Sequence, residues 1–100
     1  MKRVAITGMG TINALAPDVP GTLAAFREGR SAIGPLSLPG PRQLAVHVAA
    51  QVRDFAPERH FDRAEIGRLD RFTQFAAVAA REALREAGLP LSVDLRQRIG

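Results

Sequence analysis

Two glycines near the N-terminus form the first pattern in this sequence whose spacing could do chemistry. The run from Gly8 to Asn13 reads Gly-Met-Gly-Thr-Ile-Asn and directly follows a short apolar segment. It is one residue short of the G-x-G-x-x-G fingerprint, in which glycines let a dinucleotide pyrophosphate approach the backbone at the start of a helix. Asn13 stands in place of the third glycine, and the first clear helical pattern begins only near Asp18. The simpler interpretation is a glycine turn that packs closely against another part of the protein.

An acidic residue about 20 positions after the glycines should bind the ribose in such a fold. Glu28 has roughly that spacing, but it falls inside a predicted helix rather than at the end of a strand. A dinucleotide-binding oxidoreductase, using nicotinamide or flavin, therefore stays an alternative. We assign no cofactor and no cofactor-binding residue.

The histidines and their acidic neighbours are a second candidate site. His47 and His60 are the two histidines, and His60 is followed by Asp62 and Glu65. Three such groups on a turn and a short helix match no common metal-ligand spacing. Asp62 and Glu65 instead have the spacing of a helix capping box. Because the sequence also has no cysteine, it offers no thiol nucleophile, and we predict no catalytic residue and no metal ligand within it.

Composition and charge favour one globular domain. The chain has 100 residues, of which 46% are hydrophobic, and no apolar run approaches the ~18 residues of a membrane span. The pI near 11.3 is typical of nucleic-acid binding, yet arginines and acidic residues nearly balance between Val4 and Ser92 and the five aromatics are all phenylalanine. We therefore expect neither a nucleic-acid nor a membrane partner. A strand that begins at Arg3 is also expected to leave no room for a targeting peptide.

The elements that would position these residues alternate between strands and helices. Val4–Thr7 is predicted as a buried strand, and Asp18 caps a helix that ends at Gly29. Residues Gly34–Pro41 contain three prolines and two glycines and predict an irregular loop. Apolar residues alternate through Leu44–Val52, which predicts a strand with one apolar face.

Two further helices follow in the second half. Asp62 and Glu65 predict a short helix over Arg63–Leu69. Asp70 then caps a longer helix that stops at Gly88, and its expected buried face is mostly alanine, which would let another backbone come close. The opposite face carries charged side chains that we interpret as solvated: Arg81, Glu82, Arg85 and Glu86.

Several blocks occur in an order and spacing that resemble a known family: residues 3–11, 23–33, 70–75, 79–84, 87–89 and 98–100. Together they resemble the N-terminal portion of a β-ketoacyl-acyl carrier protein synthase, and Asp70-Arg71-Phe72-Thr73-Gln74-Phe75 resembles the elongating type II branch in particular. One departure is local, since Asn13-Ala14-Leu15-Ala16 replaces the family's usual residues after the glycine turn.

The resemblance implies a thiolase-like α/β fold, of which this chain forms the first part of one layered αβαβα half, with Gly100 inside a strand that should continue. It also implies a 3-oxoacyl-[acyl carrier protein] synthase of fatty-acid or polyketide biosynthesis, which performs a decarboxylative Claisen condensation with malonyl-acyl carrier protein. The family's catalytic cysteine, two histidines and lysine lie downstream of residue 100. The chain alone is therefore expected to be inactive, and a non-catalytic ketosynthase-like partner subunit remains an alternative.

The resemblance further implies acyl carrier protein as partner, a homodimer and a cytoplasmic location. Family members dock the acidic carrier protein on a basic patch at the short helix before Asp70. Arg63 and Arg68 match basic positions of that patch, and Arg71 is a third candidate. Ala64 and Gly67 replace further basic residues, so the patch is thinner here. The alternative is that these are ordinary surface arginines.

Overall fold

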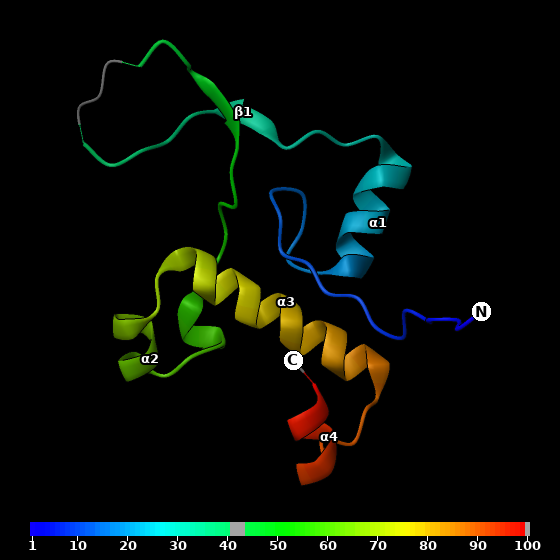
Figure 1. The fold of residues 1–100 in the computed structure, drawn as a ribbon. Coiled ribbons are helices and arrows are strands. Elements are labelled where there is room, and N and C mark those ends of the chain that lie inside the picture. The colour runs from blue at the N-terminus through cyan, green and yellow to red at the C-terminus, as the bar shows by residue number, and fades with distance from the viewer. Residues whose placement is uncertain (41–43, 100) are drawn as a thin grey trace.

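The computed structural model describes residues 1–40 and 44–99, which form helices around one long central helix (Figure 1). The elements are α1 (Val19–Glu28), β1 (Ile33–Pro35), β2 (Val48–Ala50), the 3₁₀ helix η1 (Pro57–Arg59), α2 (Arg63–Arg68), α3 (Arg71–Ala87) and α4 (Val93–Arg98). Gly100, expected inside a strand, lies outside the described residues, as does Pro41 at the end of the expected loop.

The three helices that the sequence predicts are present, whereas η1 and α4 were not predicted. Asp18 accepts a hydrogen bond from the Gly21 N–H at the start of α1, and Gly29 ends that helix with φ 64°. A left-handed residue of this kind is most easily a glycine. Local sequence therefore determines both ends of α1.

The other two predicted helices have the same kinds of ends. Asp62 and Glu65 form the expected capping box at α2, with hydrogen bonds of 2.8 and 3.0 Å. Asp70 accepts from the Thr73 N–H at the start of α3, and Gly88 terminates α3 with φ 62°. All three helices are confirmed.

The strands are shorter than the sequence predicts. The expected strand over Leu44–Val52 reduces to Val48–Ala50, which pairs antiparallel with Ile33–Pro35. The prediction that Gly34–Pro41 is irregular is wrong at its first two residues, because they belong to β1. One further hydrogen bond, from the Leu36 N–H to the His47 carbonyl at 2.8 Å, lies just beyond the paired residues. The result is a two-stranded ribbon that projects from the helices (Figure 1).

The predicted buried strand at Val4–Thr7 is also not observed. This segment has no strand partner among the described residues, and Val4 and Ile6 are 95% and 85% exposed. A strand exists only when a neighbour accepts and donates its backbone hydrogen bonds, and parallel strands need cover on both faces. The apolar residues of this segment are therefore left facing outward.

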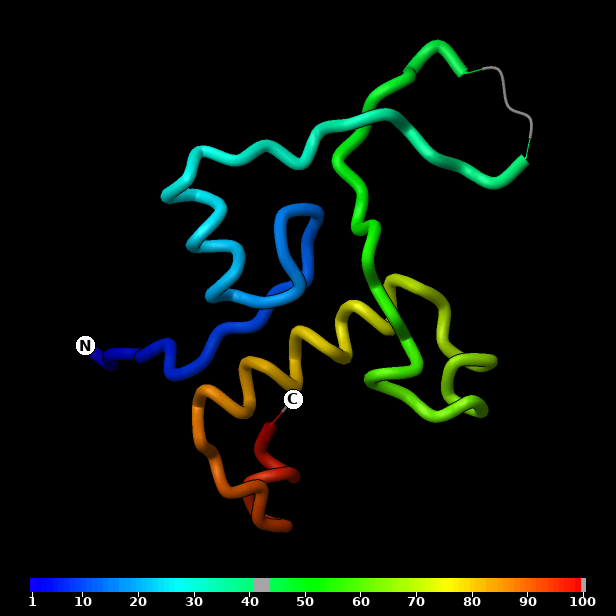
Figure 2. Tube along the Cα trace, turned by 180° about the vertical axis from the view of Figure 1, so that it is seen from behind, coloured from blue at the N-terminus to red at the C-terminus, as the bar shows by residue number. Residues whose placement is uncertain are grey.

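Helix α3 is the centre of the structure. The N-terminal segment and α1 lie on one side of it, α2 lies near its N-terminal end and α4 follows its C-terminal end (Figures 1 and 2). Only four of the described residues are buried: Ala16, Ala25, Phe61 and Gln74. The radius of gyration is 17.2 Å, against about 13 Å for a compact domain of this length. The chain is thus an open assembly around α3 with a very small core.

Candidate functional site

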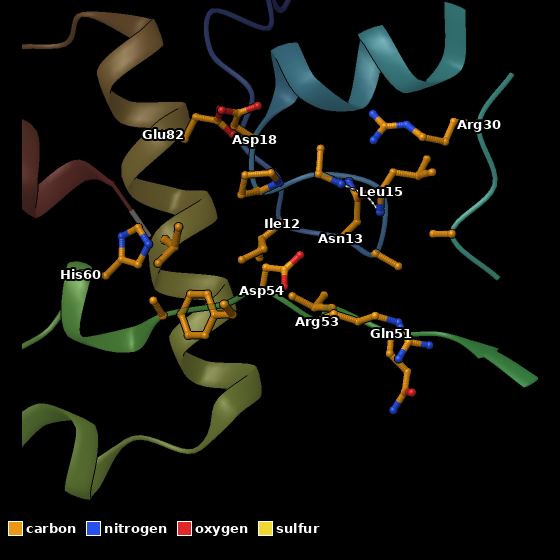
Figure 3. A pocket seen from close by; sticks show the side chains of 18 of the residues that line it. Ile12, Asn13, Leu15, Asp18, Arg30, Gln51, Arg53, Asp54, His60 and Glu82 are labelled. Carbon is orange, nitrogen blue, oxygen red and sulfur yellow. Dashed lines mark hydrogen bonds between the residues drawn. The ribbon is translucent and has the colours of Figure 1, made fainter. Parts of the chain in front are cut away.

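We call residues 9–19 the N-terminal loop. An open cavity of about 750 Å³ lies between this loop and α3 (Figure 3). Residues 12–18 of the N-terminal loop form one wall. Residues 30–35, after α1, form a second wall, and residues 51–56, after β2, form a third. One side of α3 forms the remaining wall through residues that include Arg81 and Glu82. The volume is within the range of small-molecule sites. Gly8 and Gly10 come shortly before the first of these walls in the chain.

The two N-terminal glycines pack against the backbone of α3. A Cβ atom added to Gly10 would overlap the carbonyl oxygen of Ala79, and one added to Gly8 would overlap that of Ala83. The alanines predicted on this face of α3 permit this approach, because a larger side chain would hold the loop away. This confirms close packing as the reason for the glycines.

The same contacts argue against a dinucleotide cradle. The α3 backbone occupies the space beside Gly8 and Gly10, and α1 begins only at Val19, after the whole of the loop. A pyrophosphate site would need open space beside the glycines and a helix that starts at them. The geometry therefore does not fit the oxidoreductase alternative.

Two acidic side chains on α3 hold the N-terminal loop. The Glu82 carboxylate accepts hydrogen bonds from the backbone N–H groups of Thr11, at 2.8 Å, and Val19, at 3.0 Å. Glu86, one turn later, accepts from the Met9 N–H at 2.6 Å. The interpretation of this face as simply solvated is therefore wrong for both glutamates. It failed because a backbone donor 63 to 77 residues away leaves no local pattern.

Asn13 organises the loop from inside. Its Oδ1 accepts from the Leu15 and Ala16 N–H groups at 2.8 and 3.2 Å. Its Nδ2 donates to the hydroxyls of Thr11 and Thr22 at 3.1 and 2.9 Å. Asparagine commonly bonds the backbone two residues on, so its place in a loop was the one local signal of this role.

The histidines are separated in the structure. His60 stacks on Phe55 with 5.5 Å between ring centroids, and its carbonyl accepts from Arg81 Nη1 at 2.8 Å. His47 lies beside the ribbon, where its carbonyl accepts from the Leu36 N–H. Among residues 1–40 and 44–99, no three histidine or acidic side chains form a group that could hold a metal ion.

The three arginines named as docking candidates have different surroundings. Arg63 and Arg68 are exposed on α2, and no hydrogen bond or ion pair of either guanidinium is found within the described part of the chain. Arg71 Nη2 instead donates to the Val52 carbonyl at 2.6 Å, and its guanidinium lies 5.3 Å from the centre of the Phe75 ring. Arg71 therefore also connects α3 to the segment after β2.

Comparison with known families identifies this architecture. The family described as "Beta-ketoacyl synthase, N-terminal domain" matches residues 1–100. The chain belongs to the β-ketoacyl synthase family. A 3-oxoacyl-[acyl-carrier-protein] synthase 2 from Staphylococcus aureus (strain COL) is 39% identical over 99 residues, which is 99% of this chain and 24% of that protein. Nodulation protein E from Rhizobium sp. (strain N33) is 42% identical over 99 residues, with the same two shares.

A solved structure places the fold within this β-ketoacyl synthase family. The ishigamide ketosynthase/chain length factor superposes with a TM-score of 0.73 at 32% identity, over 85% of this chain and 21% of that one. The chain therefore has the thiolase-like fold expected for the N-terminal part of a ketosynthase. It spans about a quarter of the length of the curated relatives it matches. Within the described residues, no helix is both long and apolar enough to cross a membrane.

Proposed function

We propose that this chain is the N-terminal portion of a condensing enzyme, a 3-oxoacyl-[acyl carrier protein] synthase. The observation that carries the proposal is the 39% identity, over nearly the whole chain, to relatives named as such synthases. In the reaction implied by the resemblance, a cysteine thiolate takes an acyl group from carrier protein and releases the carrier thiol. Malonyl-carrier protein then loses CO₂, and its carbanion attacks the acyl thioester, which returns the thiolate.

The role proposed for these 100 residues is architectural. The sequence has no cysteine, so the nucleophile would come from further along a longer polypeptide. The chain contributes the segment of Gly8 and Gly10, which packs on α3, and the exposed surface of α2. Residues 1–100 alone are therefore proposed to be inactive.

The first half-reaction tests the proposal. The intact polypeptide that carries this chain would be incubated with acyl-carrier protein and its mass measured. We expect a gain equal to one acyl group, removable by hydroxylamine as a thioester is. A polypeptide that is never acylated but copurifies with an active synthase would contradict the proposal. It would support the non-catalytic partner instead, an alternative suggested by the similar solved structure, which is a ketosynthase/chain length factor.

We further propose that α2 docks the carrier protein through Arg63 and Arg68, with Arg71 beside them. The support is that Arg63 and Arg68 are exposed and that neither guanidinium has a hydrogen bond or ion pair among the described residues. Positive charge there would speed the encounter with an acidic partner and orient it. Arg71 is expected to contribute less, because one of its nitrogens already bonds to the Val52 carbonyl.

Charge reversal tests the docking surface in the intact polypeptide. Arg63→Glu with Arg68→Glu is expected to raise KM for the carrier-protein substrate about tenfold, equivalent to about 1.4 kcal/mol, and to leave kcat unchanged. Arg96→Glu with Arg98→Glu changes the charge equally on exposed positions of α4 and is the matched control. An unchanged KM in the α2 variant, or an equal rise in the control, would exclude docking at α2.

The intact polypeptide is also proposed to be a homodimer in the cytoplasm, as the resemblance implies. Large apolar side chains such as Phe26 and Phe72 are exposed in this chain and are available for burial in a larger assembly. Light scattering of the purified polypeptide should give twice the mass of one chain. A monomeric mass at micromolar concentration would contradict the dimer.

A further inference from the structure

Among residues 1–40 and 44–99, Glu82 is the one side chain that hydrogen-bonds to both ends of the N-terminal loop. Its Oε1 accepts from the Thr11 N–H and its Oε2 from the Val19 N–H, at 2.8 and 3.0 Å, and both bonds are partly buried. The loop between these two residues forms a wall of the cavity, and Glu82 itself lines that cavity (Figure 3). The carboxylate therefore closes the wall at both ends.

The bond to Val19 also completes helix α1. Val19 is the first residue of α1, where a backbone N–H has no partner within the helix, and the first turn of α1 contains no acidic residue. A carboxylate near a helix N-terminus is favoured by the partial positive charge there. Glu82 supplies a negative charge at this helix end from α3, in addition to the Asp18 cap.

Glu86 repeats the arrangement one turn along α3. It accepts from the Met9 N–H at 2.6 Å in an exposed position, and residues four apart lie on one side of a helix. Gly8 and Gly10 meet the α3 backbone beside these bonds. The loop is thus fixed by its steric fit on α3 and by three hydrogen bonds from backbone N–H groups to the carboxylates of Glu82 and Glu86.

We propose that Glu82, assisted by Glu86, is the positioning residue for the N-terminal loop and hence for the shape of the cavity wall. The two carboxylates hold segment 9–19 in place, while α3 itself does not depend on them. This role is independent of the condensation chemistry proposed above. Glu82 has the larger effect because it holds two donors in a partly buried position, whereas Glu86 holds one that water can replace.

Hydrogen exchange of the intact polypeptide, read by mass spectrometry, tests the role. Glu82→Gln keeps the shape of the side chain, but its NH₂ group cannot accept a hydrogen bond. We expect exchange in peptides covering residues 9–19 to accelerate at least about tenfold, with exchange in α3 unchanged. Glu86→Gln should accelerate only the residues around Met9, and Glu58→Gln on the exposed 3₁₀ helix η1 is the neutral control.

A double-mutant cycle separates the effect of the hydrogen bond between Glu82 and Val19 from general destabilisation. Val19→Pro removes the N–H that donates to Glu82. Proline is tolerated at this position because Val19 is the first residue of α1. In that background, Glu82→Gln should accelerate exchange of the loop less than it does alone. Unchanged loop exchange in Glu82→Gln, acceleration spread evenly over α3, or a Glu82→Gln variant that fails to fold while Glu58→Gln folds, would each overturn the proposal.

Discussion

Gly10 and Asn13 fix the N-terminal loop by opposite means. Gly10 has no side chain and so reaches the α3 backbone, whereas the Asn13 side chain uses all of its hydrogen-bonding groups within the loop and α1. The close packing of the glycines was predictable from sequence, because few other reasons require two glycines after an apolar run. The roles of Glu82 and Glu86 were not, because their partners are distant in the chain and a charged helix face usually faces water.

Gly10→Ala should be strongly destabilising in the intact polypeptide. The added methyl group would overlap the Ala79 carbonyl oxygen, and a backbone atom cannot move aside as a flexible side chain can. We expect a loss of at least about 2 kcal/mol in the free energy of unfolding, measured by chemical denaturation.

Gly67→Ala is the matched control for that substitution. A Cβ atom at Gly67 meets nothing within 4 Å, and the residue is helical in α2. Alanine should therefore stabilise α2 by about 0.5–1 kcal/mol. Equal effects of the two substitutions would contradict the packing described for Gly10.

Among the elements, α1, α2 and α3 were predictable, whereas η1, α4 and the extent of the strands were not. The ends of α1, α2 and α3 depend on capping side chains and on Gly29 and Gly88, all of which act within a few residues. The segment Val4–Thr7 has a strand-like sequence, but its pairing depends on residues elsewhere. The same dependence explains why only Val48–Ala50 of the expected second strand is paired.

Asp70→Ala should weaken the start of α3. The side chain accepts from the Thr73 N–H at 2.9 Å, and loss of such a cap costs about 1 kcal/mol. The melting temperature of the intact polypeptide should fall, whereas Asp54→Ala, at an exposed position outside any helix, should leave it unchanged. A melting temperature unaffected by Asp70→Ala would show that α3 does not depend on this cap.

At the scale of the whole molecule, the described residues form an incomplete core. Four buried residues and a radius of gyration of 17.2 Å do not meet the needs of an independently stable domain, which must offset its conformational entropy by apolar burial. Family and fold were predictable from sequence. The open shape and the cavity were not, because both depend on how the elements pack together.

Residues 1–100 expressed alone should be poorly ordered or aggregated. Their exposed apolar side chains should bind a hydrophobic dye such as ANS, and heating should give no cooperative transition. Differential scanning calorimetry with a dye titration measures both. A sharp, reversible transition from a monomer would contradict this expectation.

The most direct test of the proposed function is product formation by the intact polypeptide. Acyl-carrier protein and malonyl-carrier protein would be supplied together, and the carrier-bound product and the released CO₂ would be quantified. We expect one 3-oxoacyl-carrier protein, longer by two carbons, for each CO₂ released, and no product from residues 1–100 alone. Absence of that product from a folded, intact polypeptide supplied with both carrier-bound substrates would contradict the assignment as a condensing enzyme.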